Sequence, residues 1–237
     1  MKIALIGYGK MGKAVELAAK EREHKVCFIA DINNADYKAS DLAGVDTAIE
    51  FTEPASVVQN IMKCFDAGIP AIVGTTGWYG RFDEVKNICI KKDKSLFYAS
   101  NFSIGVNMFY KINKDLAALM NSQHEYEVSV DETHHIHKKD APSGTAIELA
   151  EAINSKLDRK KNWIKGEQAA KDAIAVISHR EGEIPGTHKV QYNSEIDSLT
   201  IIHEAKNRMG FALGAIKAAE WMQGRKGVFT MSDMLGV

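Results

Sequence analysis

The sequence predicts an α/β protein with two domains, one built on a parallel sheet and a second, smaller α+β domain with a mixed or antiparallel sheet. In the first part of the chain, short apolar runs alternate with helical patterns, which is typical of parallel strands covered by helices on both faces. Beyond Asn101 the strand-like segments instead alternate apolar and polar residues, as Tyr126–Val130 does. The chain has 237 residues, which is enough for two domains of modest size.

The first domain is predicted to begin with strands that are each followed by a turn and a helix. The strands are expected at Lys2–Ile6, Val26–Ala30, Thr47–Phe51, Ile69–Val73 and Leu96–Ala99. Apolar residues at helical spacing predict helices from Met11 to Ala19, from Pro54 to a stop at Gly68, and over Arg81–Lys91. Strands and helices in this order favour a parallel sheet.

The C-terminal segment is expected to return to the first domain. It contains a predicted helix over Phe211–Met222 and a predicted strand over Gly227–Met231. The first domain is therefore expected to comprise residues 1–103 and 210–237. Chains often close a domain in this way.

Residues 104–209 are expected to form the smaller domain. Its predicted helices are Val106–Met120 and Thr145–Leu157. Its predicted strands are Tyr126–Val130, Ala173–Ser178, His188–Tyr192 and Leu199–His203. A polar loop over Thr133–Gly144 is expected to lead into the second helix.

Composition and charge argue against several classes of partner. The net charge is −1, so neither nucleic acid nor an anionic membrane is expected to attract the chain. The N-terminal run breaks at Gly7 and has no secretory pattern, and no apolar run reaches the length of a membrane span. Cys27, Cys64 and Cys89 lie among apolar neighbours, as reduced core cysteines do. A cytoplasmic location is therefore expected.

Three glycines form a G-x-G-x-x-G pattern between the first strand and the first helix. Gly7, Gly9 and Gly12 would let the backbone turn tightly and approach a pyrophosphate at the helix N-terminus. Asp31 follows Gly12 by 19 residues, at the end of the second strand, where a carboxylate can bind an adenosine ribose. A turn that merely packs a helix on a sheet is the alternative. The combination favours a Rossmann-like domain that binds NADH or NADPH.

Further cofactor contacts are expected where other parallel strands end, because ligands of open α/β sheets bind there. An equally good interpretation of these loops is that they are ordinary turns. With the glycine loop itself, the candidate cofactor-binding residues are Gly7, Tyr8, Gly9, Lys10, Met11, Gly12, Asp31, Gly74, Thr75, Thr76, Ala99, Ser100, Asn101 and Phe102.

The polar loop before the second helix of the smaller domain is rich in groups that could bind a carboxylate or move a proton. It carries three histidines and two lysines, and Ser143-Gly144-Thr145 then opens a helix. A zinc site is one alternative, but the adjacent lysines would repel a cation and no cysteine is near, so no metal is expected. A solvated loop without a role is the other alternative.

The same loop carries a resemblance to a known family. It reads E-T-H-H-I-H-K-K-D-A-P-S-G-T-A from Glu132, and it matches every fixed position of the motif E-x-H-H-x-x-K-x-D-A-P-S-G-T-A. GTTG at 74–77, NFSIGVN at 101–107 and HREGEIPGTH at 179–188 are also similar to segments of that family. The chain thus resembles the 4-hydroxy-tetrahydrodipicolinate reductases over nearly its whole length.

The resemblance implies an NAD(P)H-dependent reductase of lysine and diaminopimelate biosynthesis that acts on a cyclic dicarboxylate. It implies acid/base chemistry for His134 and proton donation for Lys138. It also implies that His135 and the helix start at Ser143, Gly144 and Thr145 bind the carboxylates of the substrate. A homotetramer formed through the sheets of the smaller domain is expected as well.

Two departures from the family pattern leave the choice of cofactor open. The glycine loop is a compact version, and Ile32 stands where many members have an arginine. Preference for the 2′-phosphate of NADPH is therefore in doubt, although Lys10 could still contact it. Two alternative functions are another Rossmann dehydrogenase, acting on homoserine or a semialdehyde, and a nicotinamide-sensing regulator. A semialdehyde dehydrogenase would need a nucleophilic cysteine in a polar loop, and none of the three cysteines fits. A regulator would be expected to have a DNA-reading element and a basic face, and the sequence indicates neither.

Overall fold

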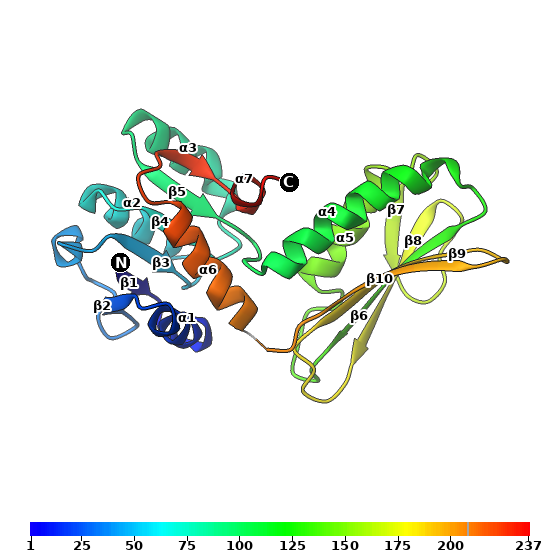
Figure 1. Cartoon of the computed structure of the whole chain (residues 1–237), viewed down its shortest axis with the longest axis horizontal. Coiled ribbons are helices and arrows are strands. Elements are labelled where there is room, and N and C mark those ends of the chain that lie inside the picture. The colour runs from blue at the N-terminus through cyan, green and yellow to red at the C-terminus, as the bar shows by residue number, and fades with distance from the viewer. Residues whose placement is uncertain (208) are drawn as a thin grey trace. The chain divides into compact units, whose positions relative to one another are not determined.

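The computed structural model describes residues 1–207 and 209–237 (Figure 1). The chain folds into two compact units. One consists of Met1–Ile104 with Arg208–Val237, and the other of Gly105–Asn207. None of the described helices is long and apolar enough to cross a membrane.

The first unit is built on a parallel sheet with the strand order β11-β5-β4-β3-β1-β2. Its strands are β1 (Lys2–Ile6), β2 (Lys25–Ala30), β3 (Thr47–Glu50), β4 (Ala71–Val73), β5 (Ser95–Tyr98) and β11 (Gly227–Phe229). Its helices are α1 (Lys10–Glu21), α2 (Val57–Ala67), α3 (Phe82–Lys91), α6 (Met209–Trp221) and α7 (Met231–Leu235), and short 3-10 helices cover Ala39–Leu42 and Tyr79–Arg81. This arrangement confirms the Rossmann-like fold class.

Both faces of this sheet are covered by helices, because successive strand residues point to opposite sides. In β1, Ala4 and Ile6 pack in the core with α2 and α3. Ile3 and Leu5 of the same strand pack in the core with α1, α6 and α7. Each face therefore has its own apolar core, and the carboxyl ends of the strands are left for loops.

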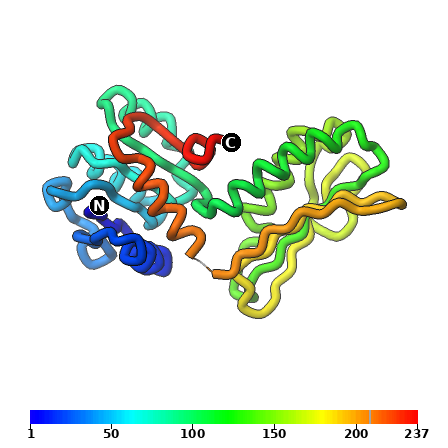
Figure 2. The backbone as a smooth tube through the Cα atoms, viewed as in Figure 1, coloured from blue at the N-terminus to red at the C-terminus, as the bar shows by residue number. Residues whose placement is uncertain are grey.

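The end of the chain lies in the first unit, where β11 pairs in parallel with β5 (Figure 2). The strand ends at Phe229, so the predicted extension of this strand to Met231 is wrong. Thr230 and Asp233 form a capping box there, with the Thr230 N–H donating to the Asp233 carboxylate at 2.7 Å. That cap starts α7, which the sequence analysis did not predict.

The second unit carries a mixed sheet with the order β10-β9-β6-β8-β7, in which β6–β8 and β7–β8 are parallel and the other pairs antiparallel. Its strands are β6 (Glu127–His134), β7 (Asn162–Lys165), β8 (Ala173–Arg180), β9 (Thr187–Asn193) and β10 (Ser198–Glu204). Its helices are α4 (Ile104–Leu119), α5 (Gly144–Asn154) and a short 3-10 helix at Met120–Ser122. Apolar residues of α4 and α5 pack on one face of this sheet.

Some predicted boundaries in the second unit need correction. The polar loop does not begin at Thr133, because β6 continues to His134 with its alternation of buried residues intact. The predicted helix after the loop ends earlier, at Asn154. Strand β7 was not predicted, and its residues are mostly exposed. In the first unit, Cys27 is exposed rather than buried, because its strand β2 is the edge of the sheet.

Candidate active site

The three glycines of the first loop occupy positions with different physical requirements. Gly7 has a φ of +94°, and a Cβ there would lie 2.1 Å from the carbonyl oxygen of Phe51. A Cβ at Gly12 would lie 2.2 Å from the carbonyl oxygen of Gly7. No atom of the described residues lies within 4 Å of a Cβ at Gly9, so this position faces open space at the N-terminus of α1. This is the pattern of a tight turn, a close helix contact and a free approach to a ligand.

A cleft of about 540 Å³ opens beside this turn. Gly7, Tyr8, Gly9 and Asp31 line the cleft, as does Ile32, a residue that is 92% exposed. The cleft is therefore lined both by the glycine turn and by Asp31, the acidic residue just after the end of β2. Such a cleft, with unpaired helix N–H groups at its edge, fits a dinucleotide.

The other candidate cofactor residues are not among those that line this cleft. Lys10 is exposed and Met11 half-buried at the start of α1. Gly74, Thr76, Ser100 and Asn101 lie in the loops after β4 and β5. Thr75, Ala99 and Phe102 are buried, and Phe102 packs against the rings of Phe51 and Phe97.

A buried polar network behind the cleft was missed by the sequence analysis. The carboxylate of Glu50, at the end of β3, accepts hydrogen bonds from Thr52 and from Asn60. Asn60 also accepts a hydrogen bond from the hydroxyl of Tyr37 at 3.2 Å. Burial raises the pKa of Glu50, although its hydrogen bonds oppose that change. Thr52, Asn60 and Tyr37 line the cleft, so this network fixes one of its walls.

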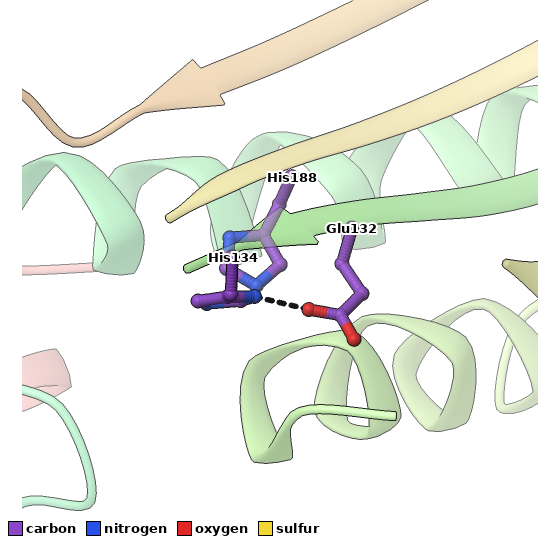
Figure 3. A group of neighbouring side chains, drawn as sticks. All are labelled: Glu132, His134 and His188. Atoms are coloured by element: carbon purple, nitrogen blue, oxygen red, sulfur yellow. Dashed lines mark hydrogen bonds and ion pairs between the residues drawn. The ribbon is translucent and has the colours of Figure 1, made fainter. Parts of the chain in front are cut away.

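In the second unit, His134 and Glu132 form a buried pair at the end of β6 (Figure 3). They are two residues apart on a strand, so both side chains point to the same face. Glu132 is 0% exposed and His134 is 7% exposed. The Nδ1 atom of His134 is hydrogen-bonded to Oε2 of Glu132. Burial alone would raise the pKa of Glu132, but the hydrogen bonds from His134 and Arg180 lower it to about 2.

The start of α5 is tied to this pair. Ser143 is the N-cap of the helix, and its hydroxyl accepts the N–H of Ala146 at 3.3 Å. The Ser143 N–H donates to Oε1 of Glu132 at 3.3 Å, and its hydroxyl lies 3.1 Å from Nε2 of His188. Burial lowers the pKa of His188 to about 3, so His188 is neutral around pH 7.

Arg180 connects Glu132 to the loop that carries the lysine. Its guanidinium donates to Oε1 of Glu132 at 3.0 Å, to the carbonyl of Asp140 at 2.6 Å and to the carbonyl of Lys138 at 3.3 Å. The ammonium of Lys138 is paired with the Asp140 carboxylate at 2.8 Å. The arginine therefore holds the backbone on both sides of Lys139.

The remaining candidate substrate residues lie close by in the chain but have fewer contacts. His135 is half-buried, and its Nδ1 atom is buried without a hydrogen-bond partner. Gly144 is exposed and Thr145 half-buried in the first turn of α5. His137, by contrast, is exposed and pairs with Glu183 at 3.0 Å. Among the described residues, nothing pairs with this buried ring nitrogen of His135.

Arg180 and His188 were not assigned a role from the sequence, nor was Glu132. Both Arg180 and His188 belong to the segment HREGEIPGTH, which carried part of the family resemblance. Their role depends on strand pairing, because Arg180 lies opposite His134 on β8, and His188 lies opposite Glu132 on β9.

Glu132, His134 and His188 could also be considered as ligands of a metal ion, since one atom of each lies within 4.8 Å of the others. The existing contacts argue against that use. Glu132 already accepts from the cationic Arg180 and from a backbone N–H, and His134 uses Nδ1 to bind Glu132. A metal would have to displace these hydrogen bonds beside a fixed positive charge.

Comparison with known proteins identifies the family. The model described as dihydrodipicolinate reductase, N-terminus, matches residues 1–102, and the C-terminus model matches residues 105–235. A 4-hydroxy-tetrahydrodipicolinate reductase of Christiangramia forsetii is 44% identical over 235 residues, which are 99% of this chain and 98% of that protein. The protein of the same name from Neisseria meningitidis is 34% identical over 206 residues, covering 83% of this chain and 74% of its own.

Solved structures show the same fold. A dipicolinate-bound dihydrodipicolinate reductase from Paenisporosarcina sp. has a TM-score of 0.76 at 21% identity, covering 98% of this chain and 99% of its own. A probable dehydrogenase from Thermotoga maritima has a TM-score of 0.60 at 10% identity, covering 99% and 92%. The alternative functions kept open by the sequence are not favoured by the family matches. Because those matches span both units, the chain belongs to the dihydrodipicolinate reductase family.

Proposed function

We propose that this protein reduces 4-hydroxy-tetrahydrodipicolinate to tetrahydrodipicolinate, with loss of water, using NADH or NADPH in lysine and diaminopimelate biosynthesis. The observation that carries the proposal is the buried Glu132–His134 pair, tied to the start of α5 and to the lysine loop. In a chain of this family, that arrangement supports a proton-transfer role for His134 and a carboxylate-binding role for the helix start beside it.

Residues 1–103 and 210–237 form the dinucleotide-binding domain in this proposal. The glycine turn, the start of α1 and Asp31 hold the pyrophosphate and the ribose. Residues of the loops after β4 and β5 (Gly74–Thr76 and Ala99–Phe102) contact the rest of the cofactor. The bound dihydronicotinamide supplies a hydride to the ring of the substrate.

Residues 104–209 form the substrate-binding and oligomerisation domain. His134 exchanges a proton through Nε2, because Nδ1 is engaged by Glu132. Lys138 donates the proton that accompanies hydride addition. His135 and the first turn of α5 from Ser143 to Thr145 bind the two carboxylates.

The cofactor preference, the cellular location and the oligomeric state are also part of what we propose. NADH serves at least as well as NADPH, because the Asp31 carboxylate favours a ribose hydroxyl over a 2′-phosphate. Ile32 supplies no positive charge beside it. The protein is cytoplasmic and forms a homotetramer through the sheet of the second unit.

The direct test is to measure initial rates of NADH and NADPH oxidation with enzymatically generated substrate. Pyridine-2,6-dicarboxylate, a planar ring with two carboxylates, should inhibit competitively against that substrate. His135→Ala should weaken its binding by about 10- to 100-fold, which corresponds to a charge-assisted hydrogen bond of roughly 1.5–3 kcal/mol. His137→Ala is the matched control, because His137 lies in the same loop but pairs with Glu183 at the surface. If the dicarboxylate does not bind the protein with cofactor present, the substrate assignment is wrong.

A further inference from the structure

The carboxylate of Glu132 is surrounded by hydrogen-bond donors that come from three segments of the second unit. Oε2 faces the ring of His134 on its own strand. Oε1 accepts from Arg180 on β8 at 3.0 Å and from the N–H of Ser143 at the start of α5 at 3.3 Å. Arg180 in turn holds the backbone carbonyls of Lys138 and Asp140 in the loop. One buried group therefore contacts, directly or through one arginine, every segment that carries a proposed active-site residue of this unit.

The charge state of Glu132 decides which nitrogen of His134 carries a proton. The low pKa of Glu132 keeps it ionised around neutral pH, and an ionised carboxylate can only accept hydrogen bonds. Nδ1 of His134 must therefore be the protonated nitrogen. In the neutral ring, the lone pair is then on Nε2.

The Nε2 side of the ring is kept clear by a glycine. A Cβ at Gly186 would lie 2.9 Å from Nε2 of His134, closer than side chains approach one another. The ring of His188 lies beside that of His134, with 5.0 Å between the two ring centroids. Burial keeps His188 neutral, so it adds no charge next to Nε2 around pH 7.

We propose that Glu132 is the positioning residue of the active site: it holds the proton of His134 on Nδ1, so that Nε2 exchanges the proton with substrate, and it fixes the start of α5 beside that ring. The catalytic part of this inference rests on the proposed role of His134. The tautomer part does not, because it concerns only the free protein.

The substitution Glu132→Gln should change which nitrogen of the His134 ring carries the proton. The amide oxygen can still accept from Arg180 and Ser143, but the amide N–H₂ then faces Nδ1 of His134. An N–H₂ group needs an acceptor, and Nδ1 can accept only if its proton moves to Nε2. The variant should therefore hold His134 in the opposite tautomer, with the reactive nitrogen blocked.

The experiment is ¹⁵N NMR of histidine-labelled full-length protein at alkaline pH, where imidazole is neutral, with His134 assigned from its missing signals in His134→Gln. We expect a protonated Nδ1 in the wild type and in Glu132→Asp, and a protonated Nε2 in Glu132→Gln. The matched control is Glu127→Gln on the same strand, which removes a carboxylate paired with Lys160 and should leave the His134 tautomer unchanged. A wild-type ring protonated on Nε2 would overturn the inference, even if Glu132→Gln fails to fold.

Measurements of kcat and KM distinguish a failure of this inference from a failure of the proposed function. In Glu132→Gln, kcat should fall on the order of 10²-fold, the lower range for loss of a positioned proton-transfer group, while the KM for NADH changes little. Glu132→Asp should recover part of that kcat. If the tautomer switches but kcat stays near the wild-type value, Glu132 does not act through His134 in catalysis and that part is refuted. If His134→Ala itself keeps full activity, the proposed role of His134 fails while the tautomer result still stands.

Discussion

Alanine at Gly9 and at Gly12 should separate the binding role of the glycine turn from its folding role. At Gly12, the new Cβ would lie 2.2 Å from the backbone carbonyl oxygen of Gly7. A backbone atom cannot swing away as a flexible side chain can, so α1 or the turn has to move. Overpacking of this kind costs about 1–3 kcal/mol. The better helix propensity of alanine returns at most about 1 kcal/mol.

At Gly9 the same methyl group has no atom of residues 1–207 and 209–237 within 4 Å, and the φ of −77° suits any residue. Alanine loses less chain entropy on folding than glycine, which is worth about 0.4–1 kcal/mol, but it is a poorer N-cap by a similar amount. The stability of the free protein should therefore change by less than about 0.5 kcal/mol. The methyl would instead occupy the space through which a pyrophosphate approaches the helix N–H groups. Loss of one such charge-assisted hydrogen bond, roughly 1.5–3 kcal/mol, weakens binding about 10- to 100-fold.

Urea unfolding and calorimetric titration with NADH and NADPH measure the two effects on the same samples. Gly9→Ala should unfold at the wild-type urea concentration and bind either cofactor poorly. Gly12→Ala should unfold at lower urea. Wild-type affinity in Gly9→Ala would show that the cofactor does not pass over this glycine. Unchanged stability in Gly12→Ala would show that the turn relaxes at no cost and that the steric argument is wrong.

Three further predictions concern single side chains. Lys138→Ala should lower kcat by about 10²–10⁴-fold without changing cofactor binding, and a near-normal kcat would exclude Lys138 as the proton donor. Asp31→Ala should raise the KM for NADH more than that for NADPH, whereas a strong wild-type preference for NADPH would contradict the role of this carboxylate. Burial lowers the pKa of His188 from 6.5 to about 3, so below pH 6.5 the unfolded chain binds a proton that the folded chain refuses. The stability of the wild type should fall as pH drops from 6.5 towards 3, and urea unfolding of His188→Gln should show a shallower fall; an equally steep one would mean that other groups cause it.

Much of this protein could be predicted from local sequence patterns. The strands of the first unit and the helices between them follow from the period of their apolar residues, which depends only on neighbours in the chain. The glycine spacing and Asp31 predicted the turn and the cleft residues beside it, because a tight turn needs glycine whatever surrounds it. The histidine–lysine loop carried the family resemblance, and the comparisons confirm the family.

Tertiary structure decided the features that depend on distant segments. The pairing of β6 with β8 and β9 brings Arg180 and His188 to the Glu132–His134 pair, and no local pattern specifies which strands become neighbours. Burial then decides what the Glu132 carboxylate can do. In an exposed loop, water would compete for its hydrogen bonds, and it could not hold a histidine in one tautomer. The extension of β6 through His134 was missed for the same reason, because Glu132 and His134 are polar residues at buried positions of the strand. Polar residues occupy such positions only when the fold supplies their hydrogen-bond partners, and one partner of Glu132 is Arg180, which lies 48 residues further along the chain in β8.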